Sequence, residues 1–78
     1  MMEYVIVDFP DRREVLVDGA GRGYNRELTG EPRILRIDEG LHRFRLRGPD
    51  NYIPLWFTVD VTGTNVNAPL TVVFTKKV

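Results

Sequence analysis

The sequence predicts an all-β fold in one domain spanning residues 1–78, a small antiparallel β-sandwich or open barrel of six to seven strands. Three observations support this fold class. Apolar residues alternate with polar ones at the two-residue period of a strand, no window of about 11 residues keeps a helical period, and glycine or proline recurs about every ten residues. A chain of this length buries roughly 60% of its unfolded surface, which is enough for one thin core.

The first third of the chain predicts two strands and a tight turn. Residues 3–9 (EYVIVDF) are rich in β-branched and aromatic residues, and residues 14–17 (EVLV) follow after a Pro-Asp turn. The Asp-Gly pair at 18–19 is a strong hairpin signal. The glycine-rich residues 20–30 predict a loop, within which residues 24–28 form a short edge strand.

The middle of the chain predicts a β-hairpin made of residues 32–37 and 41–47, joined by a tight Glu-Gly turn. Leu35 and Phe44 must face the same side, because a register slip of one residue would move every side chain to the other face. The Glu-Gly turn is therefore expected to be a two-residue loop or its four-residue equivalent. The predicted pairs are Ile37 with His42, Leu35 with Phe44, and Arg36 with Arg43.

The last third predicts two more strands. Residues 55–61 (LWFTVDV) and 70–76 (LTVVFTK) have the composition and alternation of strands. Residues 48–54 and 62–69 are rich in glycine, proline and asparagine, and they predict the connecting loops.

The predicted hairpin places four arginines on one outer face, which we treat as a candidate binding face. These are Arg36, Arg43, Arg45 and Arg47. Like charges opposite one another are destabilising, so a negative group is expected nearby. It is either the protein's own carboxylates, such as Asp60, Glu14 or Asp18, or an anionic partner. The chain is neutral overall, but residues 1–18 carry a net charge of −3 and residues 33–47 a net charge of +3.

Several of these segments resemble the PEGA domain family, a small β-sandwich module. Residues 15–19 (VLVDG) and 30–32 (GEP) match the frame of that family, and residues 38–41 (DEGL) stand at its Pro-Glu-Gly-Ala position. Residues 51–52 (NY) stand near its Gly-Tyr, followed by the strand at 57–61. The resemblance implies a non-catalytic module of the kind found in surface-layer-like or extracytoplasmic proteins, with no catalytic residue to carry over.

The residue inventory argues against an enzyme. The sequence has no serine or cysteine and one histidine, His42, which we expect to be half-buried at a sheet end. The glycine-rich residues 18–23 lack the Gly-Lys-Ser/Thr ending of a phosphate loop. Four acidic residues near the N-terminus lack the spacing of an EF-hand and predict a solvated acidic edge; they are Asp8, Asp11, Glu14 and Asp18. No catalytic residue, metal site, cofactor or disulfide is expected.

Aromatic residues supply a second candidate contact. Trp56 and Phe57 point to opposite faces of one strand, and Phe57 continues the apolar series of that strand into the core. Trp56 is then exposed, and together with Tyr52 it forms a candidate aromatic contact for a sugar ring, a base or a partner protein. The alternative is that Trp56 covers a sheet edge or lies beneath the loop at 48–54.

Three functions follow from these features. The first is a non-catalytic module that binds another protein or itself, because a small sheet leaves a strand edge free. The second is carbohydrate binding through Trp56 and Tyr52. The third is single-stranded nucleic-acid binding through the arginine face, which the neutral net charge disfavours. No apolar run reaches the ~20 residues of a membrane span, and with no signal peptide the chain is expected in the cytoplasm unless it belongs to a larger exported assembly.

Overall fold

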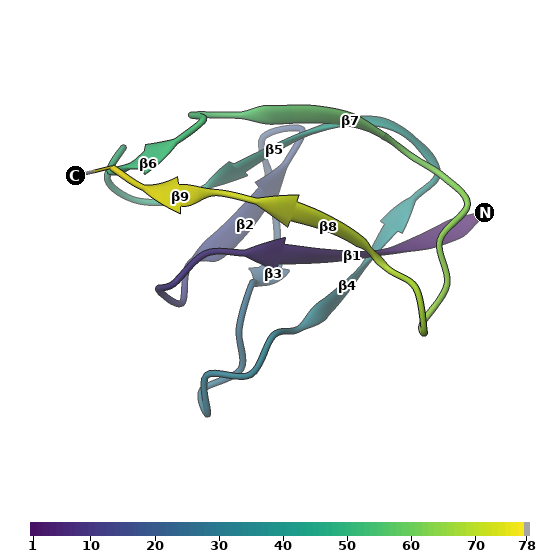
Figure 1. Ribbon diagram of the computed structural model, residues 1–78. Coiled ribbons are helices and arrows are strands. Elements are labelled where there is room, and N and C mark those ends of the chain that lie inside the picture. The colour runs from purple at the N-terminus through teal and green to yellow at the C-terminus, as the bar shows by residue number, and fades with distance from the viewer. Residues whose placement is uncertain (78) are drawn as a thin grey trace.

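The structure is a computed structural model, and it describes residues 1–77. This part of the chain contains nine strands and no helix, arranged as two larger sheets and one two-stranded sheet (Figure 1). The strands are β1 (Met2–Asp8), β2 (Glu14–Val17), β3 (Ala20–Tyr24), β4 (Ile34–Asp38), β5 (Gly40–Leu46), β6 (Tyr52–Ile53), β7 (Phe57–Val61), β8 (Leu70–Val73) and β9 (Thr75–Lys76). The all-β prediction is confirmed. A helix able to cross a membrane is absent from residues 1–77.

The three-stranded sheet has the order β4-β1-β8, with β1 in the centre. β1 runs antiparallel to β4 and parallel to β8, so the sandwich is not antiparallel throughout. Alternate residues of β1 face the interior, where Val5 and Val7 are buried. Leu35 and Ile37 of β4 are buried beside them, as their alternation predicted.

The four-stranded sheet has the order β3-β2-β5-β7 and is antiparallel. Asp18 and Gly19 join β2 to β3 with φ angles of 53° and 85°. Positive φ at both central residues is the geometry of the tight hairpin turn that Asp-Gly favours, so this turn prediction is confirmed. β3 itself lies at 20–24, where a loop was expected, and ends where the predicted edge strand at 24–28 would have begun.

The predicted hairpin between residues 32–37 and 41–47 is wrong, although both segments are strands. β4 pairs with β1, whereas β5 pairs with β2 and β7, so the chain passes from one sheet to the other between them. Gly40, with a φ of 132°, lies at this crossing. Leu35 and Phe44 are both buried in the core, but they come from different sheets. Residue alternation is the same for two paired strands and for two strands that face each other, which explains the error.

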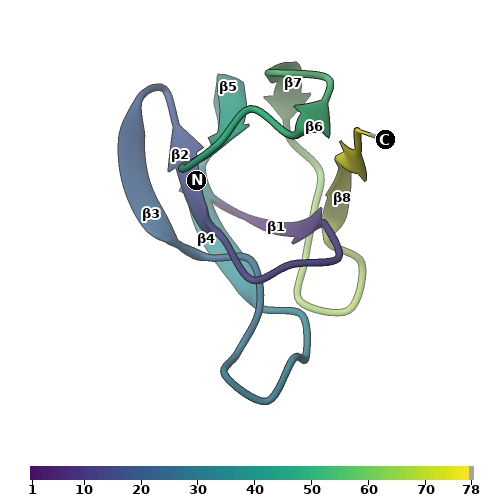
Figure 2. The same cartoon turned by 90° about the vertical axis from the view of Figure 1, so that its left-hand side faces the viewer.

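The two larger sheets curve around a common interior, seen from one end in Figure 2. The core consists of Val5, Val7, Phe9, Val15, Val17, Leu35, Ile37, Phe44, Leu46, Tyr52, Val61, Val72 and Phe74. β6 and β9 pair with each other at the end where the C-terminus lies. β6 lies within residues 48–54, which were expected to form a loop. β9 lies within residues 70–76, which were expected to form one continuous strand, and buried Phe74 separates it from β8.

Candidate functional site

The four arginines that were predicted to share one face are divided between the two larger sheets. Arg36 lies on the exposed side of β4, whereas Arg43 and Arg45 lie on the exposed side of β5 and Arg47 follows directly. The division follows from the separate pairing of β4 and β5, so the prediction of a single four-arginine face is wrong. A smaller basic surface of three arginines remains on β5 and the residue that follows it.

The charge of Arg47 is balanced by a carboxylate of the same chain. Arg47 Nε donates to Glu14 Oε1 over 2.6 Å. Glu14 was one of the carboxylates expected to serve this purpose. The pair lies above Gly21 of β3, because a Cβ built on Gly21 would come 2.5 Å from Glu14 Oε2. A glycine on β3 therefore leaves the space that this ion pair occupies.

The histidine connects both sheets at the end of the core. His42 Nδ1 lies 2.6 Å from Asp18 Oδ2, and its Nε2 lies 2.7 Å from the carbonyl oxygen of Asp38. Both partners are acceptors, so the protonated ring can donate to both at once. Asp18 also accepts the backbone N–H of Arg43 over 3.0 Å. The histidine is partly buried, as expected, and it is held by its neighbours on both nitrogens.

These contacts shift the titration of both groups. The hydrogen bond to Asp18 raises the pKa of His42 above its usual 6.5, and partial burial opposes the shift. The backbone N–H of Arg43 lowers the pKa of Asp18, and the hydrogen bond from His42 adds to the effect. The pair is therefore stabilised in its charged form, which suits a structural link better than a general base.

The other two arginines of β5 border an open hollow of about 490 Å³. Its lining residues are Asp18, Gly19, Leu41, His42, Arg43, Arg45 and Thr58. The guanidinium of Arg43 lies over the ring of Trp56, 5.4 Å from its centre. Among residues 1–77, neither Arg43 nor Arg45 has a carboxylate within ion-pair distance. These two charges are therefore available to a partner.

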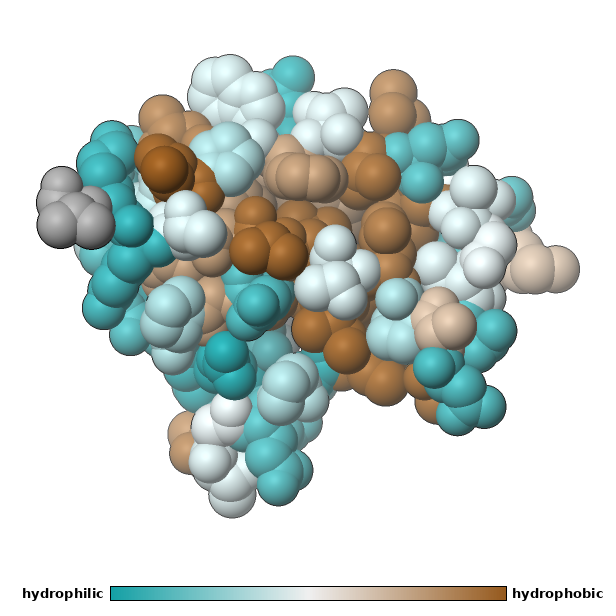
Figure 3. Space-filling model, in the orientation of Figure 1, coloured by the Kyte–Doolittle hydropathy of each residue, from teal (hydrophilic) through white to brown (hydrophobic). Residues whose placement is uncertain are grey.

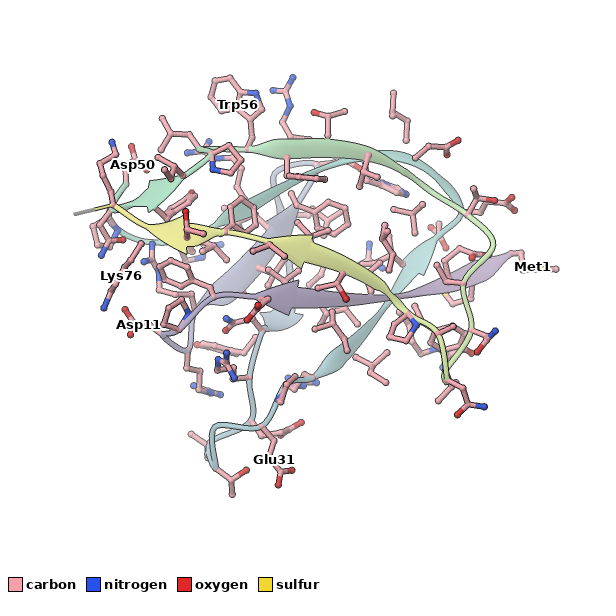
Figure 4. The ribbon with its side chains drawn as sticks, viewed as in Figure 1. Met1, Asp11, Glu31, Asp50, Trp56 and Lys76 are labelled. Atoms are coloured by element: carbon pink, nitrogen blue, oxygen red, sulfur yellow. The ribbon has the colours of Figure 1, made fainter. Side chains whose placement is uncertain are left out.

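The aromatic contact predicted from Trp56 and Tyr52 is wrong in one of its two members. Tyr52 is fully buried, and its hydroxyl group donates to the carbonyl oxygen of Leu46 over 3.0 Å. Its ring packs edge-on against Phe9 and Phe74. Trp56 is 51% exposed and stands on the outside near the start of β7 (Figure 4). A sugar would therefore meet one aromatic ring here, and Arg43 already covers part of it.

The acidic edge predicted near the N-terminus is paired with cations. Asp8 lies 3.4 Å from Arg26, Asp11 lies 2.9 Å from Lys76, and the other two acids are the partners of Arg47 and His42 described above. Figure 4 shows Asp11 and Lys76 approaching each other from the two ends of the chain. Within the described residues, no group of three or more side chains is placed to hold a metal ion.

Sequence reasoning missed the polar network that ties the loops together. Arg13 donates to the carbonyl oxygens of Arg47 and Pro49 and to the side chain of Asn51, over 2.7–2.9 Å. Buried Asn25 accepts the backbone N–H of Arg13 over 2.7 Å. No local pattern marks these residues, because every partner is distant in the sequence.

Glu3 is a second buried polar group that the sequence did not reveal. It is 2% exposed, and Oε1 accepts the backbone N–H and the hydroxyl group of Thr64 over 2.8 and 2.7 Å. These hydrogen bonds lower the pKa of Glu3. The contact fastens the loop at 62–69 to β1, so it is structural.

Part of the exposed apolar surface lies where β7 and β8 end their sheets. Phe57, Val59 and Leu70 are only partly buried there, and we call these three residues the β7–β8 seam. Beyond the seam, Ile53 is 49% and Val73 47% exposed. Figure 3 shows apolar atoms forming a band across this face along β7 and β8. No backbone hydrogen bond joins β7 to β8 in the described part of the chain.

No family model, curated protein or solved structure matches this chain. The PEGA resemblance therefore stays a prediction.

Proposed function

We propose that this chain is a non-catalytic β-sandwich module that binds another protein or a second copy of itself. The observation that carries the proposal is the β7–β8 seam, where two strand edges and an apolar band are left uncovered. Large exposed apolar patches on small proteins mark interaction sites. Unpaired strand edges offer main-chain hydrogen bonds to an added strand.

The chemistry of the polar residues supports a binding role over a catalytic one. The single histidine is held on both nitrogens by Asp18 and Asp38, and the sequence has no serine or cysteine to act as a nucleophile. Arg43 and Arg45, which lack an ionic partner among residues 1–77, line an open hollow on the four-stranded sheet. Such charges steer and orient a partner more than they transform a substrate.

The experiment is a comparison of two valine substitutions on exposed positions. Val73→Asp changes β8 beside the seam, and Val66→Asp changes the loop at 62–69, where the valine is 57% exposed. Solution size is measured by light scattering over a concentration series, and proteins captured from a native lysate are compared. Association or capture that is lost in Val73→Asp and kept in Val66→Asp supports the proposal. A strict monomer whose captured proteins are the same for both variants overturns it.

A further inference from the structure

β7 carries few of the features that protect an edge strand, and its one charged residue is Asp60. It is the last strand of the four-stranded sheet, and its sequence, FTVDV, contains no proline, glycine or lysine. Its register with β5 is continuous over five pairs, without a bulge. Natural sheets protect their edges with proline, with charged residues and lysine above all, with bulges or with covering segments. An edge with so little protection is suited to pairing with another strand.

The sequence of β7 is suited to pairing with itself. If two copies of β7 run antiparallel about Val59, then Phe57 lies opposite Val61 of the second copy, and Thr58 lies opposite Asp60. All five residues are paired, and apolar residues meet apolar residues on the inner face. In this register the symmetry axis passes through a residue. The residues whose N–H and C=O groups point to the free edge of β7 therefore lie opposite each other and can form hydrogen bonds. An axis through Asp60 would instead place two carboxylates opposite each other, which is unfavourable.

Charge complementarity selects the same register. Thr58 is paired with Arg43 of β5, so Asp60 of the second copy continues that row on the exposed face. Strands lie roughly 4.8 Å apart, which places the two Cα atoms about 10 Å from each other, within the combined reach of an arginine and an aspartate. Neither Arg43 nor Asp60 has an ionic partner in residues 1–77. The two-fold axis creates this contact twice.

We propose that this chain forms a two-fold symmetric dimer in which β7 pairs antiparallel with β7 of a second copy, centred on Val59. The two four-stranded sheets then become one continuous sheet. The second copy covers the exposed side of the β7–β8 seam, and each Asp60 faces Arg43 of the other copy. The inference rests on the proposed function and names a second copy as the partner.

The first test adds a charge on one side of the new strand pair and then reverses the charge opposite it. Thr58→Asp places a carboxylate opposite Asp60 of the second copy at two symmetric positions, and the dimer Kd should rise about tenfold or more. The double variant Thr58→Asp/Asp60→Lys makes both pairs attractive and should restore the dimer. Thr71→Asp, an exposed threonine on β8, is the matched control and should leave Kd unchanged. Kd is measured by sedimentation equilibrium, and thermal unfolding checks that each variant folds.

A second test does not depend on charge. The chain contains no cysteine, so Val59→Cys introduces a single thiol at the symmetry axis. Facing Cα atoms in an antiparallel pair are about 4.5–5.5 Å apart, which is within disulfide range. Oxidation with copper phenanthroline should give cross-linked dimers from Val59→Cys and none from Thr71→Cys.

The outcomes separate this inference from the proposed function. A wild-type chain that stays monomeric at every concentration overturns the dimer. Dimerisation that Thr58→Asp and Thr71→Asp weaken equally places the contact elsewhere and also overturns it. A monomer that captures a different protein through Val73 leaves the proposed function intact, because another chain then occupies the edge.

Discussion

β3 and β7 are the two outer strands of the same four-stranded sheet, and they end it in different ways. β3 has glycines at two of its five positions, and its register with β2 shifts between Glu14 and Leu16. Arg22 of β3 donates to the carbonyl oxygen of Arg36 on β4 over 3.2 Å, which bridges the two sheets. β7 has a regular register and an apolar inner face, and no backbone hydrogen bond joins it to β8 within residues 1–77.

The difference shows that a small sheet can have a closed side, whose outer strand is held by contacts within the chain, and an available side, whose outer strand is free to pair. Ion pairs and loop contacts concentrate on the β3 side, where Glu14 meets Arg47 and Asp18 meets His42. On the β7 side, Arg43 and Asp60 have no ionic partner in the described chain. The closed side stabilises the single chain, and the available side is where we propose that association occurs.

The largest loss of stability is expected for a substitution of Asn25, which anchors the closed side. Asn25→Ala removes the acceptor of the Arg13 N–H and the donor to the carbonyl oxygen of Asp11, in a buried site. The free energy of unfolding should fall by about 2–3 kcal/mol, because buried groups lose their partners. Urea denaturation measures it, with exposed Asn67→Ala as the control. Equal stability of the two variants would mean that β3 is held by other contacts.

A smaller effect is expected at the turn that begins β3. Gly19 has a φ of 85°, a conformation that costs most residues about 1 kcal/mol. Gly19→Ala should therefore lower the free energy of unfolding by about that amount, and Gly19→Asn by less, since asparagine tolerates this conformation. Thermal unfolding of both variants checks the order. The reverse order would contradict the turn geometry.

The link between His42 and Asp18 should make the closed side sensitive to pH. The folded-state pKa of His42 lies above 6.5, so its contribution to stability is complete below pH 6.5 and is lost as pH rises through the folded value. The free energy of unfolding should fall over that interval in the wild type and stay flat in His42→Gln. Denaturation at closely spaced pH values measures it. A wild-type profile parallel to that of His42→Gln would exclude the link.

The smallest changes in the free energy of unfolding are expected for two carboxylates, one from each side of the sheet. Glu14→Gln breaks the pair with Arg47 and should cost at most about 1 kcal/mol, as for exposed ion pairs. Asp60→Asn removes a charge that has no ionic partner among residues 1–77, and it should change stability by less than about 0.5 kcal/mol. Both are measured at low chain concentration, where the proposed dimer would not form. A cost for Asp60→Asn equal to that for Glu14→Gln would show that Asp60 has a partner in the monomer.

Much of the fold was predictable because it depends on local chemistry. Alternation predicted that Leu35, Ile37 and Phe44 share one side, and all three are buried. The Asp-Gly pair predicted the β2–β3 turn. The position of Trp56 outside and Phe57 toward the core also followed from strand parity. Tyr52 was misjudged, because a two-residue strand inside a loop has too short a pattern to reveal its direction.

The sequence by itself determined which residues form strands, which face of each strand is apolar, and where the tightest turn lies. These follow from backbone preferences and the two-residue period, which act over a few neighbouring residues. The tertiary structure decided which strands pair, and with that, how the arginines divide between two surfaces. Strand pairing depends on contacts between distant segments, and the same alternation fits a neighbour in the sheet or a strand across the core. The exposed edge of β7 is a consequence of that choice, since a strand becomes an edge only when no other strand takes the place beside it.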